Sequence, residues 1–291
     1  MDILYKYTSH IDSFFKKPTL KLSVPGFLND PFEESISKDL YSRIECEEDG
    51  QAEWDCKAAI YELGVVSFSE TSRNLLMWAH YANEHKGMCI GFDPSVLDSL
   101  EKYGYNCESY AYYPEKINYD NLRVDIHNLP DELFSESIAK KILTTKSDDW
   151  IYEKEHRCIV PIGWSDSAYL IKDNYKAEIA LREFYSAYIN PVTKEITSAT
   201  NQNLMFEHIT HYDGILFLKE INPEMVRTIH FGCKYPLDEI EKIINKISEA
   251  THPLHHLRMY RYSLDKYRFE LESTLIYSEG VSYIHHLYST K

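Results

Sequence analysis

Hydrophobic and polar positions alternate over short stretches of the chain, and this alternation predicts strands. Residues 64–69 are β-branched and alternating, and residues 88–92 form a short apolar run, so each stretch is expected to be a strand. The same criteria give further strands at residues 3–7, 20–24, 110–113, 156–162, 214–218 and 223–231.

Apolar residues spaced three and four apart predict helices at residues 74–85, 133–143, 177–188 and 237–250. Residues 33–62 also read as helical and acidic, and Gly87 is expected to end the helix before it in a left-handed conformation. Strands and helices do not alternate in a regular βαβ rhythm. This order favours an α+β fold with a mixed, mostly antiparallel central sheet and flanking helices.

Neither an internal repeat nor a low-complexity linker divides the chain. The prediction is one α+β, catalytic-like domain over residues 1–250, followed by a C-terminal extension over residues 251–291. Neither the glycine-rich dinucleotide-binding fingerprint nor a P-loop pattern is present, which argues against both of those nucleotide-binding folds.

Composition narrows the class of protein further. The 291 residues are 44% hydrophobic and carry a formal net charge of -15, which disfavours non-specific binding to nucleic acid or to an anionic membrane. The chain starts without a basic and apolar leader and contains no run of about 18 apolar residues, so a cytoplasmic protein without membrane contact is expected. The six cysteines form no C-x-x-C pair, and the histidines of residues 252–256 have no partnered acid, so no metal site is predicted.

Two stretches carry candidate chemistry, and the first covers residues 67–81. Ser67 and Ser69 have the same parity on a strand, so their hydroxyls point to one face and suit a ribose or a phosphate. Trp78, His80 and Tyr81 share the next helix and suit stacking on a planar ring. The alternative is a polar outer strand face followed by a core Trp and Tyr with a buried His.

The second stretch covers residues 150–162. If the strand begins near Tyr152, then Glu153, Glu155 and Arg157 share one face. Two carboxylates about 7 Å apart on one face suit an enzyme that stabilises a cationic transition state. The alternative is an exposed charged strand of little energetic value, but the apolar residues 159–162 indicate that the strand enters the core.

The motifs in these stretches resemble a known bacterial family, the "domain of unknown function 2971" family. The resemblance rests on motifs in the family's order, at residues 4–7, 27–33, 67–69, 77–93 and 150–157, with similar stretches at 221–223 and 229–233. It covers roughly residues 3–247 and leaves the end of the chain outside.

The order of motifs is also similar to that of ADP-ribosyltransferase-like enzymes, which have an early His or Arg, a Ser-x-Ser strand and a late Glu-x-Glu strand. This resemblance implies an enzyme that uses NAD as its substrate without a metal. Glu155 and Glu153 would be catalytic, the first holding the ribose and the second orienting or deprotonating the acceptor. NAD would contact a set of residues from three motifs: Tyr5, Lys6, Tyr7, Ser67, Ser69, Trp78, His80, Tyr81 and Arg157. Tyr5-Lys6-Tyr7 offers neither His nor Arg, so Lys6 or a tyrosine takes that place.

The resemblance further implies a toxin or effector of bacterial anti-phage defence, with an antitoxin or defence partner and a protein or nucleic acid as acceptor. The rival hypothesis is a non-catalytic sensing or interaction module of a defence system, in which the same residues are core and scaffold. The tail leaves two readings open as well. Arg258, Arg261, Lys266 and Arg268 stand among tyrosines and are opposed over residues 257–269 by Asp265 alone. They either bind single-stranded nucleic acid or pair with acids of this protein, such as those of residues 45–49.

Overall fold

The computed structural model describes residues 3–9, 12–33, 35, 37, 38, 40, 42, 58–98, 110–123, 135–199 and 201–287. Most of the helix expected over residues 33–62, and the acids of residues 45–49, lie outside these ranges. In the described part the predicted α+β fold is confirmed: it has a large, mostly antiparallel sheet and several helices.

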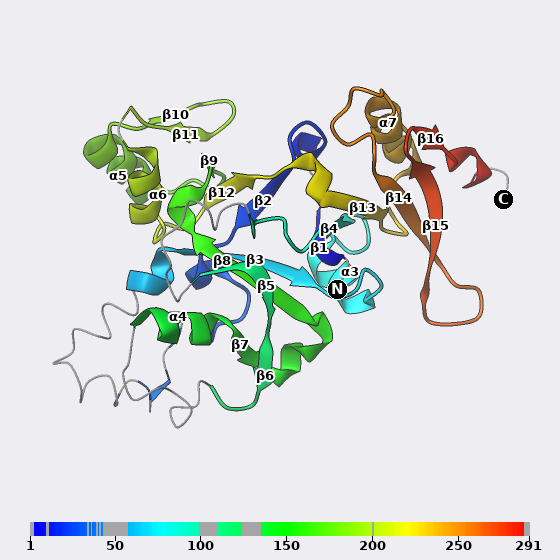
Figure 1. Ribbon diagram of the computed structural model, residues 1–291. Helices are drawn as coiled ribbons and strands as arrows, with labels where there is room; N and C mark the ends of the chain where they lie inside the picture. The colour runs from blue at the N-terminus through cyan, green and yellow to red at the C-terminus, as the bar shows by residue number, and fades with distance from the viewer. Residues whose placement is uncertain are drawn as a thin grey trace.

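The largest sheet has nine strands, and all neighbours pair antiparallel except β13 with β14 (Figure 1). Its strands, in spatial order, are β16 (Val281–Ser282), β15 (Leu271–Ser278), β14 (Arg258–Leu264), β13 (Val226–Phe231), β4 (Met88–Phe92), β1 (Leu4–Thr8), β3 (Leu63–Ser69), β8 (Glu155–Pro161) and β5 (Ala111–Lys116).

A second sheet of five antiparallel strands lies against the first. In spatial order it contains β10 (Tyr188–Ile189), β11 (Glu195–Thr197), β9 (Ser167–Leu170), β12 (Ile215–Glu220) and β2 (Thr19–Leu22). The two sheets are tied where Ser23, just after β2, exchanges backbone hydrogen bonds of 2.9 and 2.8 Å with Val65 of β3. A small parallel pair, β6 (Asn118–Asp120) with β7 (Thr145–Ser147), completes the strands.

Among the α-helices of the described ranges, those with defined bounds flank the sheets. They are α3 (Leu75–Tyr81), α4 (Ser135–Leu143), α5 (Tyr175–Tyr185), α6 (Gln202–His208) and α7 (Leu237–Ile247). Helix α7 shows why the pattern predicts them: Ile240, Ile243, Ile244 and Ile247 recur at helical spacing, and all four are buried. It lies beside β14 and β15, whereas α5 and α6 lie beside the second sheet (Figure 1). None of these helices has the length and apolar character that crossing a bilayer requires.

One local expectation is wrong. Helix α3 ends at Tyr81, and the left-handed residues after it are Asn83, Glu84 and His85, with φ of 47°, 54° and 69°, whereas Gly87 is not among the residues with positive φ. Gly87 is needed for a different reason, because a Cβ there would lie 2.3 Å from the carbonyl oxygen of Thr8. Residues 258–282, assigned to the extension, add β14, β15 and β16 to the nine-stranded sheet.

Candidate functional site

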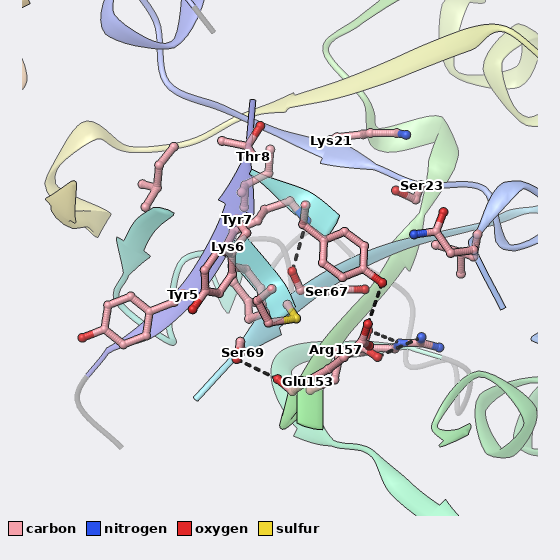
Figure 2. A pocket seen from close by; sticks show the side chains of 18 of the residues that line it. Tyr5, Lys6, Tyr7, Thr8, Lys21, Ser23, Ser67, Ser69, Glu153 and Arg157 are labelled. Carbon is pink, nitrogen blue, oxygen red and sulfur yellow. Dashed lines mark hydrogen bonds and ion pairs between the residues drawn. The ribbon is translucent and has the colours of Figure 1, made fainter. Parts of the chain in front are cut away.

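A cavity opens where β1 and β3 diverge. The two strands pair at Tyr5 and Ser69, and farther along the Lys6 ammonium donates to the Ser67 carbonyl at 3.1 Å. The space between β1, β2, β3 and β12 is a cavity of about 570 Å³. Figure 2 shows Lys6, Ser67 and Ser69 on β1 and β3, and Lys21 and Ser23 on the segment of β2, all of which line the cavity.

A buried cluster of charges forms the floor of this cavity. The Lys146 ammonium lies 2.7 Å from a Glu153 carboxylate oxygen, 3.2 Å from Glu155 and 3.4 Å from Glu33. The Arg157 guanidinium contacts Glu155 at 2.7 Å and Glu33 at 2.8 Å, and also donates to the Leu143 carbonyl at 2.7 Å. All five charged side chains are nearly inaccessible to solvent. Since an unpaired buried charge is costly, each of these groups depends on its neighbours.

The backbone places the two late carboxylates differently from the predicted strand. Glu153 ends the 3₁₀ helix η5 (Asp148–Glu153), Lys154 is left-handed with φ of 47°, and β8 begins only at Glu155. The single left-handed residue breaks the strand alternation that would have put the two carboxylates side by side. They nevertheless converge, because both accept from Lys146. Arg157 and Glu155 do share one strand face, as expected.

The environment separates the proton affinities of the two carboxylates. Burial alone would raise the pKa of Glu155, but Arg157 and Lys146 outweigh it and lower that pKa to about 2. For Glu153 the effect of burial is the larger one, and its pKa is raised despite the attraction of Lys146. Pairs of carboxyls with pKa values pushed apart are typical of sites in which one group stays ionised and the other exchanges a proton.

Helix α3 brings an aromatic hydroxyl to this pair. The Asn74 side chain caps the helix by accepting from the backbone of Leu76 and Met77 and also donates to the Tyr152 carbonyl at 2.6 Å, which holds the helix against η5. At the other end, the Tyr81 hydroxyl donates to Glu153 at 2.5 Å. Burial and the Glu153 carboxylate raise the pKa of Tyr81, so this hydroxyl keeps its proton.

Two residues expected to contact a ligand lie elsewhere. Trp78 is fully buried on the opposite side of α3: its ring packs edge-on against Tyr7 at 5.3 Å, and its indole donates to the Ser72 carbonyl at 2.8 Å. It does not line the cavity and so cannot stack on a ring bound there. His80 is exposed and is not a lining residue either. The other residues expected at the site do line the cavity, namely Tyr5, Lys6, Tyr7, Ser67, Ser69, Tyr81, Glu153, Glu155 and Arg157.

Some of these residues support the cavity wall instead of offering free groups. The Ser69 hydroxyl donates to the Glu153 carbonyl at 2.7 Å, and the Tyr7 hydroxyl donates to the Thr71 carbonyl at 2.7 Å. Ser67 forms a hydrogen bond with Glu155 that helps to lower the pKa of that carboxyl. The two serines predicted to act together therefore hold the two glutamates, one each.

The lining also includes residues that the sequence analysis did not name as site residues, among them Glu33, Lys146, Lys21 and Ser23. Glu33 carried a weak signal, because it ends the turn motif that resembles the family. Lys146 carried none, since it stands on the three-residue strand β7 and its role depends entirely on contacts with distant residues.

Lys6 and Lys21 give the cavity a positive side. Within the described residues neither ammonium has a carboxylate partner, and Lys6 donates only to a backbone carbonyl. Burial and the nearby Lys21 lower the pKa of Lys6 to about 8, whereas the Lys21 side chain is exposed at the rim of the cavity. Two amines without a counter-ion in one cavity form a site suited to an anion.

Comparison with known proteins finds one family model, which matches a stretch of the chain that includes residues of this site. Residues 77–158 match the model of a family described as "Protein of unknown function (DUF2971)", a stretch that contains Tyr81, Lys146, Glu153, Glu155 and Arg157. The match supports the family resemblance of these motifs. Neither a curated protein nor a solved structure matches the chain.

Proposed function

We propose that this protein is an ADP-ribosyltransferase-like enzyme that uses NAD as its substrate. The observation that carries the proposal is the convergence, in one cavity, of Lys6, Ser69, Tyr81 and the Glu153/Glu155 pair from four separate segments. Convergent polar groups in a cleft of several hundred cubic ångströms are typical of small-molecule sites. The split between β1 and β3 of an antiparallel sheet is the feature of the fold that supports this assignment.

The charge distribution of the cavity matches that of NAD. NAD carries a cationic nicotinamide ribose at one end of an anionic diphosphate. The ionised Glu155 lies on the cavity floor, whereas Lys6 and Lys21 line its other side. In the proposed pose the diphosphate contacts the two lysines, and the nicotinamide ribose lies over the carboxylates. Tyr81, not Trp78, is the ring of α3 available to stack on nicotinamide.

The two carboxylates then take different parts in the transfer. As the bond from ribose C1′ to the nicotinamide nitrogen breaks, its electron pair leaves with nicotinamide, and positive charge develops on the ribose. Glu155 stabilises this charge and holds the ribose hydroxyl. The acceptor nucleophile forms the new bond to C1′ and gives its proton to Glu153, whose raised pKa suits a general base.

A second candidate function has its own support in the saturated charge cluster. Lys146 and Arg157 already engage both carboxylates, as in a purely structural network. The chain would then be a sensing module that binds an anionic ligand at Lys6 and Lys21 without consuming it. A role in anti-phage defence accompanies either candidate and rests on the family resemblance.

One experiment separates these candidates. Purified protein is incubated with NAD, and free nicotinamide is measured by chromatography while NAD binding is followed by calorimetry. Nicotinamide release supports the enzyme. Binding of NAD without any release supports the sensing module. Neither binding nor release overturns the NAD assignment for this cavity.

A further inference from the structure

A second positive surface lies away from the cavity, on the C-terminal part of the large sheet. A groove of about 350 Å³ runs between the turn after α3 and strand β14. Its lining residues include Lys234 and Arg261, together with His85 and Ser263, and none of the lining residues is acidic. In a chain of formal net charge -15 this is a local reversal of sign.

Two nitrogens of this groove lack hydrogen-bond partners. The Arg261 Nε and the His85 Nδ1 are buried without a hydrogen bond within the described part of the chain. Arg261 makes a single described hydrogen bond, from Nη2 to the Cys233 carbonyl at 3.2 Å, and burial lowers its pKa. Burial and then the nearby Lys234 lower the pKa of His85. Lys234 and Arg261 thus line one groove that has no acidic lining residue, and the lowered pKa keeps His85 neutral at neutral pH, so an anion in the groove would balance the two cations.

The backbone holds His85 at the groove. Its left-handed conformation follows two other left-handed residues, and its carbonyl accepts from the Lys234 backbone at 3.1 Å. Gly232 permits this approach, since a Cβ there would lie 2.1 Å from the His85 carbonyl oxygen.

The hairpin that leaves the groove carries exposed aromatic rings. Strands β14 and β15 pair as far as Leu264 and Leu271, and the tip between them presents Tyr267 at 93% and Phe269 at 102% exposure. Figure 1 shows this hairpin extending away from the body of the fold. The rings alternate with Lys266 and Arg268, both exposed. Large rings left in water at a loop tip indicate a binding surface.

Two acids near the tip, Asp265 and Glu270, are already engaged, whereas Glu272, opposite Ser263 on β15, is exposed. Glu270 pairs with Arg73 at 3.3 Å and with Arg268 at 4.0 Å, and the Asp265 carboxylate accepts from the backbone of Tyr267 and Arg268 at 2.7 Å each. In the described residues Lys266 and Lys234 have no ion-pair partner. The alternative, that the basic residues of the tail pair with acids of this protein, has no partner acid for Arg258 or Lys266 in the described residues. The acids of residues 45–49 lie outside the described ranges.

We propose that the groove and the hairpin tip together bind single-stranded nucleic acid. Phosphates would lie along Lys234, Arg261, Lys266 and Arg268, while bases stack on Tyr267 and Phe269. Interleaved cations and exposed rings are the combination that holds a single strand without reading its sequence. A duplex offers phosphates but keeps its bases stacked inside, so the two rings favour the single strand. This inference is independent of the proposed use of NAD.

The test is fluorescence anisotropy of a labelled oligo-uridine of about twenty nucleotides, long enough to exceed a typical single-strand site. The double variant Tyr267→Ala/Phe269→Ala should weaken binding about tenfold or more, because stacking on each ring contributes strongly. Both rings are fully exposed, so folding is not at risk. The matched control is Tyr175→Ala/Phe184→Ala, which removes a Tyr and a Phe exposed at 76% and 75% on α5 and should leave binding unchanged.

The salt dependence tests the phosphate contacts. With four cations the logarithm of the binding constant should fall against the logarithm of salt with a slope of about -3, and Lys234→Ala should reduce that slope by about 0.7. No binding at low salt overturns the proposal, as does equal loss in the α5 control. Tighter binding to anionic phospholipid vesicles than to the oligonucleotide would assign the surface to a membrane and likewise overturn it.

Discussion

The Lys6 ammonium of β1 donates to the Ser67 carbonyl of β3 at 3.1 Å, where the two strands part. This contact leaves the positive charge of Lys6 without a carboxylate at the edge of the cavity. Since its pKa is lowered to about 8, Lys6 is protonated below that pH and neutral above it.

Lys6 should therefore make NAD binding depend on pH. The KM for NAD should rise as the pH increases through about 8, because the cation that faces the diphosphate is lost. Lys6→Arg should keep the low KM to higher pH, since a guanidinium stays charged, and Lys6→Met should have a high KM throughout. A pH profile of KM that is identical in Lys6→Arg and wild type would contradict this role.

Glu155→Gln should abolish nicotinamide release. The substitution keeps the volume and removes the negative charge that faces the developing cation, so a loss of at least about 100-fold in kcat is expected. The control is Glu70→Gln, since Glu70 pairs with His156 and Lys116 outside the cavity. Its kcat should equal that of wild type. Circular dichroism must show that Glu155→Gln is folded, and undiminished release by a folded variant would remove Glu155 from the mechanism.

Lys146→Met should destabilise the fold by about 3–5 kcal/mol at neutral pH, because it leaves Glu33, Glu153 and Glu155 buried with Arg157 as their single remaining cation. Loss of the cation raises the pKa of these carboxyls, so the variant should regain stability as the pH falls toward 5. In wild type the two carboxyls act in opposite directions, because the raised pKa of Glu153 favours the folded state as the pH falls, whereas Glu155 opposes this at lower pH. Glu155 has a lowered pKa, so its contribution is complete above about 4.5 and is lost as the pH falls toward 2. Urea unfolding at several pH values measures both trends.

Trp78 and Tyr81 lie on the same helix and should respond differently to substitution. Trp78→Ala should cost about 3–5 kcal/mol of unfolding free energy, as expected for a large buried ring. Tyr81→Phe should leave the melting temperature within a few degrees of wild type and lower kcat about tenfold, since it removes the hydrogen bond to Glu153. If a Trp78→Phe variant keeps its stability but loses as much activity as Tyr81→Phe, Trp78 takes part in the site after all.

How well the sequence predicts a feature of this protein depends on whether the interactions that form it are local or long-range. Met88–Phe92 is an apolar run whose two ends match the observed strand, because local patterning decides a buried strand. The resemblance also predicted that Ser69 and Glu155 belong to one site although their motifs lie far apart in the chain, and both line the same cavity. The cation that pairs with Glu153 and Glu155 was not predicted. Lys146 lies on a short strand with no periodic pattern, and its selection depends on three carboxylates that the fold alone brings together.

The single parallel pair of the large sheet, β13 with β14, has a consequence for the integrity of the protein. Strand β13 is almost entirely buried, and β14 occupies its hydrogen-bonding edge. A chain cut before Leu257 would present that apolar edge to solvent, where it becomes a template for pairing with other molecules. By covering this edge, β14 therefore protects the protein against aggregation. A truncated chain should form insoluble oligomers on light scattering, and a monodisperse truncated protein would show that another segment covers the edge.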